Sequence, residues 1–238
     1  MLIDLHVHAA PRGPSLEGLL ARGPVAGLDG AAVVGEDAFA DVRGRRGREE
    51  LALFAGAQVT TDRGLYLVFV PEPDRLPPLD QLFGPRVDGT WPVRDVLARA
   101  RALGGAVGAA HPYDLEVFPP GGDILFTLPH LTAIEAVFAG RPPTLSYPAV
   151  EAAETLGLPC VGGSGARAEG EVGRAATLFA GEVRDEAGLV EALQSGACWP
   201  VELSAPPREL LRRSSSAHPG GPTAAPRDGA SPQRRRAR

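Results

Sequence analysis

The chain has 238 residues, a formal net charge of −5, 44% hydrophobic residues and 22% charged residues. This length suits one large α/β domain as well as two small ones, and the composition is ordinary for a globular protein. The modest negative charge indicates neither nucleic acid nor an anionic membrane as a partner. No stretch approaches the roughly 18 continuous apolar residues of a membrane span, and the N-terminus lacks a signal-peptide pattern. We therefore expect a cytoplasmic protein.

Strand-length apolar runs alternate with amphipathic, helix-length segments from the N-terminus onward. The pattern predicts strands at 2–8, 31–37, 54–61, 65–70, 106–112, 132–138 and 160–165, and helices within 15–30, 93–105 and 148–159. This alternation favours parallel strands joined by crossover helices, in a barrel or a wound sheet. In either fold, functional residues lie at the carboxyl ends of the strands.

Two segments are predicted to lie outside this pattern. Residues 71–92 are rich in proline and have no clear period, which is typical of a long loop that forms a lid or rim. From about Ala205 the composition shifts to Pro, Ser, Gly and Arg. We therefore expect a folded domain over 1–205 and a disordered tail over 206–238, whose terminal basic cluster is interpreted as solvated rather than as a nucleic-acid patch.

Titratable residues occur in or just after several predicted strands. His6 and His8 share one face of the first strand with Asp4, because side chains alternate along a strand. Other strands contribute Glu36, Asp37, His111, Asp114 and Glu135. A lone histidine beside an apolar run is usually structural, and we interpret His130 and His218 in this way. The recurrence of His6, His8 and His111 predicts instead that one barrel mouth gathers them.

Cys160 and Cys198 lie in apolar contexts without CxxC spacing. The pattern favours two buried thiols over a disulfide or a metal site.

Six segments resemble, in order and spacing, the motifs of the PHP (polymerase and histidinol phosphatase) family. They are DLHVH, AAVVGED, AGAQVTTDRGLYLVFV, GGAVGAAHPYD, AIEAVFAGR and LPCVGGSGARAEGEVGRAATLF, and they span roughly residues 1–203. The resemblance implies an α/β fold, a distorted (β/α)7 TIM-like barrel with two or three divalent metals at the strand ends. Such centres hydrolyse phosphoesters, because a metal-bound hydroxide attacks phosphorus while the cations neutralise the phosphate oxygens. In that setting Asp4 would orient a ligating histidine.

The family's ligand set is only partly present. Of nine expected ligand positions, three keep their residue: His6, His8 and His111. Two change to another possible ligand, because the usual TDH motif reads GED and places Glu36 and Asp37 there. Four lose their ligand: Gln58, Leu65, Gly165 and Arg167. A complete cluster would therefore lack donors and negative charge, and Arg167 adds a permanent cation that could pair with Glu36 or Asp37.

Two functions remain open. The preferred one is a barrel that has lost most metal ligands, hydrolyses weakly or not at all, and binds an anion or a partner protein. The alternative is a phosphoesterase with a single divalent metal (zinc, manganese or iron) acting on a small phosphorylated substrate. The candidate metal ligands are His6, His8, Glu36, Asp37 and His111. The candidate catalytic residues are Asp37 and Arg167, and the candidate substrate-binding residues are Arg63 and Arg167.

Under either function we expect a small anionic or phosphorylated ligand, without membrane or nucleic acid. The cofactor is one metal or none, since the three histidines could equally persist as hydrogen-bonded packing. A third interpretation makes Ser164 a nucleophile, although GGSGA does not match the G-x-S-x-G pattern.

Overall fold

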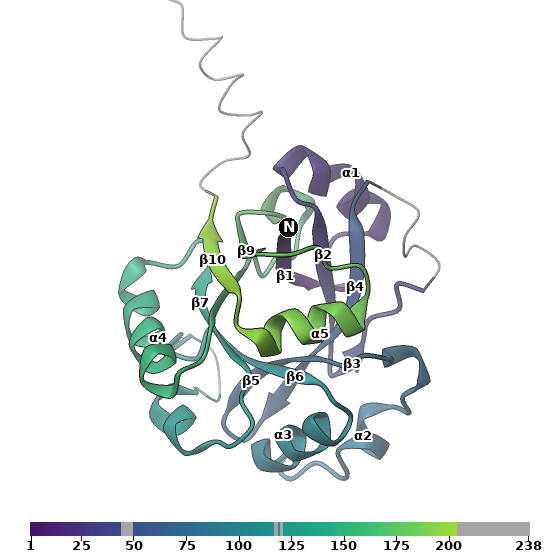
Figure 1. The fold of residues 1–238 in the computed structure, drawn as a ribbon. Helices are drawn as coiled ribbons and strands as arrows, with labels where there is room; N and C mark the ends of the chain where they lie inside the picture. Colours follow the sequence, from purple (N-terminus) through teal and green to yellow (C-terminus); the bar gives the residue numbers. More distant parts are fainter. Residues whose placement is uncertain (44–49, 117–118, 120, 204–238) are drawn as a thin grey trace, which may run out of the picture.

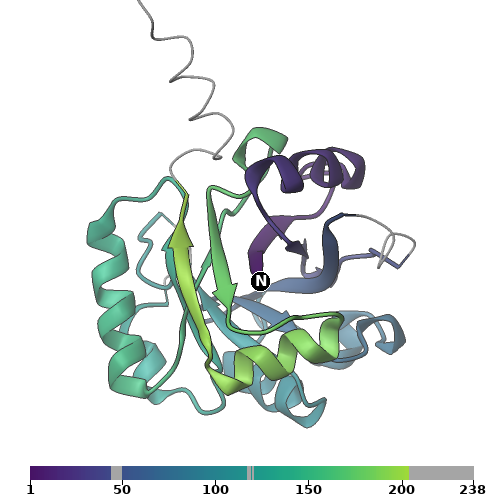
Figure 2. The same cartoon turned by 45° about the horizontal axis from the view of Figure 1, so that its top comes forward.

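The computed structural model describes residues 1–43, 50–116, 119 and 121–203. Its strands form one sheet in the order β10-β9-β1-β2-β4-β5-β6-β7-β8, with the short β3 beside β2. The strands are β1 (Leu2–His8), β2 (Gly30–Glu36), β3 (Ala38–Phe39), β4 (Ala52–Thr61), β5 (Gly64–Phe69), β6 (Ala106–Ala110), β7 (Ala133–Phe138), β8 (Cys160–Gly163), β9 (Ala175–Phe179) and β10 (Cys198–Glu202). The sheet curls into a nearly closed barrel (Figures 1 and 2).

Barrel closure brings the two ends of the parallel part of the sheet together. The segment after β8 meets β1 through a parallel bridge between Val7 and Ala166, and the amide of His8 donates to the carbonyl of Ala166 at 3.0 Å. β5 runs antiparallel to β4 and β6, and β9 runs antiparallel to β1. The predicted TIM-like barrel is confirmed, and these antiparallel strands are its distortion.

Helices cover the outside of the barrel and one of its ends. They are α1 (Leu16–Ala26), α2 (Leu79–Leu82), α3 (Val93–Ala102), α4 (Pro143–Leu156) and α5 (Glu186–Ser195), with 3-10 turns at η1 (Pro73–Arg75), η2 (Gly122–Thr127) and η3 (Glu169–Glu171). Helix α5 lies across one end of the barrel (Figures 1 and 2), where Leu189, Val190 and Leu193 join the same buried cluster as Ile3 and Phe54. The functional residues predicted from the strand ends face the other end.

The predicted helices at 15–30, 93–105 and 148–159 correspond to α1, α3 and α4. Helix α1 begins at Ser15, whose hydroxyl accepts from the Gly18 amide, and α4 ends at Gly157 with φ of 66°. Such caps are common signals of helix ends. None of the helices in the described segments is long and apolar enough to cross a membrane.

The segment 71–92 is more ordered than the sequence predicts. It contains η1 and α2, and Trp91 is fully buried with its indole N–H donating to the Gly84 carbonyl at 2.9 Å. The guanidinium of Arg86 lies 3.7 Å from the centre of the Trp91 ring. These contacts order the segment internally, and the Trp91 amide attaches it to the end of β4 by donating to the Thr60 carbonyl at 3.3 Å. The predicted tail, its boundary at 205 and His218 lie outside the described residues.

Candidate functional site

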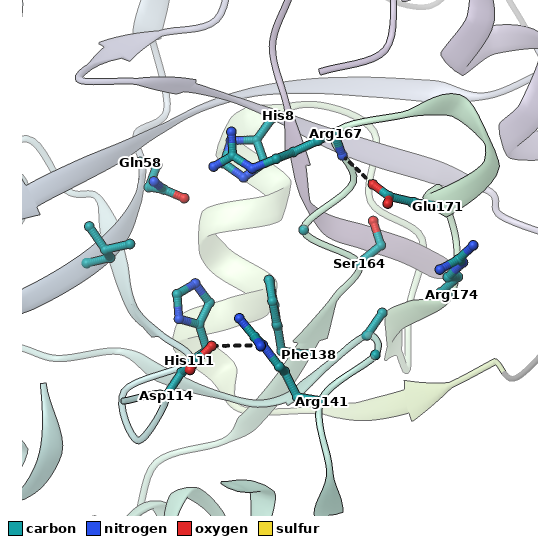
Figure 3. A pocket seen from close by; sticks show the side chains of 14 residues that line it. His8, Gln58, His111, Asp114, Phe138, Arg141, Ser164, Arg167, Glu171 and Arg174 are labelled. Carbon is teal, nitrogen blue, oxygen red and sulfur yellow. Dashed lines mark hydrogen bonds and ion pairs between the residues drawn. The ribbon is translucent and has the colours of Figure 1, made fainter. Parts of the chain in front are cut away.

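The carboxyl ends of the parallel strands surround a pocket of about 360 Å³, which we call the mouth pocket. Its lining includes two histidines, one aromatic ring and three arginines: His8, His111, Phe138, Arg141, Arg167 and Arg174 (Figure 3). These residues come from β1, β7 and the segments after β6, β7, β8 and η3. Parallel-barrel topology explains how residues so distant in sequence meet at one mouth.

His6 is fully buried beneath the pocket and uses both ring nitrogens. Its Nδ1 lies 3.0 Å from Glu135 Oε1, and its Nε2 lies 2.8 Å from Gln58 Oε1. Burial acts to lower the pKa of His6, but the Glu135 charge and the hydrogen bonds to Glu135 and Gln58 together raise it above its ordinary value. Because both partners offer acceptor oxygens, this arrangement stabilises a doubly protonated, cationic ring.

His8 and His111 are instead held neutral. Burial, with the nearby cationic groups His6 and Arg167, lowers the pKa of His8 to about 3. Burial is also the main cause that lowers the pKa of His111. The Nδ1 atoms of both rings are buried without a hydrogen-bond partner in the described residues. A neutral imidazole with a free nitrogen can bind a metal or a ligand donor.

Glu36 is held by two guanidinium groups. Arg12 contacts one carboxylate oxygen of Glu36, and Arg167 Nη1 lies 3.0 Å from the other. His8 Nδ1 lies 3.4 Å from the same oxygen that Arg167 contacts. The expected pairing of Arg167 with Glu36 or Asp37 is therefore made with Glu36.

Asp37 and Arg63 lie outside the mouth pocket. Asp37 accepts from the Thr60 amide at 3.0 Å and pairs with Arg86 at 2.8 Å, and it lines two neighbouring hollows. Arg63 lies on the turn between β4 and β5, 58% exposed, with its Nε 3.6 Å from Asp62. The structure thus brings His6, His8, Glu36, His111 and Arg167 together, whereas the roles predicted for Asp37 and Arg63 stay predictions.

Asp4 contacts backbone amides and the Ser164 hydroxyl rather than an imidazole. Its carboxylate accepts from the amides of His6 at 3.2 Å, Ser164 at 2.9 Å and Gly173 at 3.0 Å. Burial raises its pKa to about 6, against these hydrogen bonds. Asp4 therefore fixes the chain after β8 against β1, and it orients no histidine ring.

The Ser164 hydroxyl contacts the Asp4 carboxylate and backbone groups. It accepts from the Ala166 amide at 3.1 Å and reaches the His6 carbonyl at 3.5 Å. In the described part of the chain no imidazole is hydrogen-bonded to this hydroxyl, so the arrangement of a serine nucleophile with its base is not formed.

Several residues of the mouth were given no specific role from sequence, although Glu135 was among the titratable residues expected there. Glu135 bonds His6 and also accepts from the His111 amide at 3.0 Å. A carboxylate inside the apolar run AIEAVF is the signal that marks it. Arg141, whose Nε lies 2.9 Å from Asp114, and Arg174 lie in loops, where no periodicity indicates direction. Phe138 ends β7 and reads as an ordinary core residue.

Three features bear on whether the mouth can hold metals. Both nitrogens of His6 already have protein partners, and the Glu36 carboxylate is held by two arginines. A Cβ added at Gly165, where the family motif has aspartate, would lie 2.2 Å from the Phe138 ring. His6, His111 and Glu135 nevertheless offer three ligand atoms within 4.8 Å of one another. Histidine and carboxylate together suit zinc, manganese or iron.

The fold and the mouth define a TIM-like barrel protein with histidines and carboxylates at its strand ends. A family model described as PHP-associated matches residues 147–198. No curated protein matches the chain by sequence. This match covers the last part of the folded region and agrees with the resemblance seen in the motifs.

Three solved structures share the fold. PsfC from Pseudomonas syringae PB-5123 aligns with a TM-score of 0.63 and 22% identity over 90% of this chain and 96% of its own. A candidate metal-dependent phosphoesterase from Bifidobacterium adolescentis aligns with a TM-score of 0.57 and 16% identity. The alignment covers 82% of this chain and 96% of that one. An amidohydrolase from Chromobacterium violaceum, with bound sulfate and no metal, aligns with a TM-score of 0.53 and 15% identity. The alignment covers 72% of this chain and 89% of that one.

Proposed function

We propose that the mouth pocket binds a small anionic ligand, such as a phosphate monoester, through arginine side chains, with weak or no hydrolysis. The observation that carries this proposal is the convergence of Arg141, Arg167 and Arg174 on one pocket. Among the described residues Arg174 pairs with no carboxylate, so its charge is available to a ligand. Guanidinium groups bind phosphate oxygens through paired, charge-assisted hydrogen bonds.

In this proposal fixed cations replace the metal cluster. Glu135 and Gln58 raise the pKa of His6 and so favour its cationic form, and Arg167 occupies a position where the family motif has a ligand. Phe138 fills the space that a side chain at residue 165 would need. The sulfate bound without metal in the Chromobacterium violaceum amidohydrolase is consistent with an oxyanion held by a barrel of this fold.

The ligand is proposed to be a small molecule. A pocket of about 360 Å³ lies in the range of small-molecule sites. The net charge of −5 disfavours nucleic acid, and we keep the expectation that no membrane is involved.

Calorimetric titration with inorganic phosphate at low salt tests the proposal. Arg174→Gln should weaken binding about tenfold, because a charge-assisted hydrogen bond is lost. Arg99→Gln on the outer helix α3 makes the same change in net charge away from the mouth and should leave binding unchanged. Equal effects of the two substitutions, or no phosphate binding by the parent protein, would contradict the proposal.

A second candidate, a phosphoesterase with one metal, is favoured by the His6–His111–Glu135 group and the free Nδ1 of His111. Bound there, a divalent ion would polarise a phosphoryl oxygen and lower the pKa of a water. Elemental analysis of protein purified without chelator or affinity-tag metal distinguishes the candidates. One equivalent of transition metal that Glu135→Gln removes, with p-nitrophenyl phosphate hydrolysis that His6→Ala abolishes, would establish the enzyme. Substoichiometric metal and negligible turnover are expected.

A further inference from the structure

The mouth pocket has two chemically different kinds of lining. Arg141, Arg167 and Arg174 supply positive charge, whereas Leu65 and Phe138 are apolar. In Figure 3 the Phe138 side chain extends beside that of Arg141 toward the middle of the pocket. A pocket for inorganic phosphate alone would need only the arginines, so the uncharged residues require a separate explanation.

The uncharged lining is held in place by the fold. Leu65 pairs with Ala110 across β5 and β6, so it lies next to His111, and its side chain is only half-buried. The Phe138 and His111 rings lie 4.4 Å apart between centroids with planes tilted by 54°. Gly165 makes room for the Phe138 ring, because a Cβ at Gly165 would approach it to 2.2 Å. The ring therefore has a defined position at the pocket wall.

We propose that the ligand of the mouth pocket carries a flat apolar body attached to its anionic group, as in an aryl phosphate or aryl phosphonate. This inference rests on the anion-binding function proposed above. The arginines would hold the anionic group, and Leu65 and Phe138 would contact the body. Aromatic ligands gain both from buried apolar area and from ring–ring contact.

Two phosphonates that cannot be hydrolysed make a matched pair of probes. Phenylphosphonate and methylphosphonate carry the same anionic group and differ in the body attached to it. Calorimetric titration of the parent protein should give phenylphosphonate about fivefold tighter binding, the size of one aromatic contact. Leu65→Gln and Phe138→Leu should each reduce this ratio, because each weakens phenylphosphonate binding more than methylphosphonate binding.

The outcomes separate this inference from the function on which it rests. Equal affinities of the parent for both phosphonates, with both weakened by Arg174→Gln, would overturn the aryl preference and keep the anion site. A preference that survives both the Leu65 and the Phe138 substitutions would place the body elsewhere and also overturn the inference. If neither phosphonate binds, the proposed anion-binding function fails and this inference with it.

Discussion

Replacing Gly165 with alanine should destabilise the protein more than the same replacement at Gly157. Both glycines have left-handed backbone, with φ of 61° and 66°. A Cβ at Gly157 would have no heavy atom within 4 Å, whereas a Cβ at Gly165 would lie 2.2 Å from the Phe138 ring. Gly157 therefore measures the backbone cost alone, and the difference between the two variants measures the clash.

The expected magnitudes follow from these two contributions. A non-glycine residue in left-handed backbone costs about 1–2 kcal/mol, which is the whole effect expected for Gly157→Ala. Overpacking of a filled site adds about 1–3 kcal/mol, so Gly165→Ala should lower the free energy of unfolding by about 2–5 kcal/mol. The Phe138 ring cannot easily move away, since it packs against His111 and His6 with centroids 4.4 and 5.5 Å distant.

Urea unfolding of the two variants, each in the parent and in a Phe138→Ala background, isolates the contact. In the Phe138→Ala background the cost of Gly165→Ala should fall to that of Gly157→Ala, which would appear as a coupling energy between positions 138 and 165. Equal costs of the two glycine variants in the parent would refute the reasoning. Phe138 would then not fill the space of a residue-165 side chain, and restoring an aspartate ligand there would need no further change.

Two further predictions concern charge at the mouth. Glu36→Gln should raise phosphate affinity severalfold in calorimetric titration. The substitution removes the carboxylate that pairs with Arg12 and Arg167, so both guanidinium groups become available to the ligand. Unchanged affinity would show that these arginines do not reach the ligand. Burial lowers the pKa of His8 to about 3 in the folded protein, whereas the ordinary pKa of histidine is 6.5. As the pH falls below 6.5, His8 is therefore protonated in the unfolded chain before it is protonated in the folded protein. Through this group, the free energy of unfolding should drop by up to about 1.4 kcal/mol per pH unit between about pH 6 and pH 4. Urea unfolding at each pH should show a smaller slope for His8→Gln than for the parent. An identical slope would mean that His8 titrates normally in the folded protein.

The fold was largely predictable because its strands are buried and its helices are capped. The runs at β2 and β4 are almost wholly buried and consist mostly of apolar residues, and Gly157 marks the end of α4. Order in the segment 71–92 was not predictable. The single turn α2 depends on burying Leu79 and Leu82 in the core, and such tertiary packing leaves no periodic signal in four residues.

The meeting of His6, His8, Glu36, His111 and Arg167 could be predicted, because parallel strands place their carboxyl ends at one mouth. The ion-pair and hydrogen-bond partners of the mouth residues could not be predicted. Arg12, Arg86 and Arg141 lie in loops, whose course depends on the whole fold. The Asp4 carboxylate accepts a hydrogen bond from the Ser164 amide, which lies more than 150 residues away in the sequence. No local pattern carries that information.

The charge pairs suggest how a barrel of this kind can exist without a metal cluster. Carboxylates crowded at a mouth repel one another unless cations lie between them, and metals supply those cations in a metal-dependent centre. Here Glu36 is paired with Arg12 and Arg167, Asp37 with Arg86, Asp114 with Arg141, and Glu135 with His6. Each of these four carboxylates thus has a cationic side chain of the protein beside it, which no chelator can remove. Arg174 has no ion-pair partner among the described residues, so its guanidinium can face an anion in the mouth pocket, although Glu171 lines the same pocket.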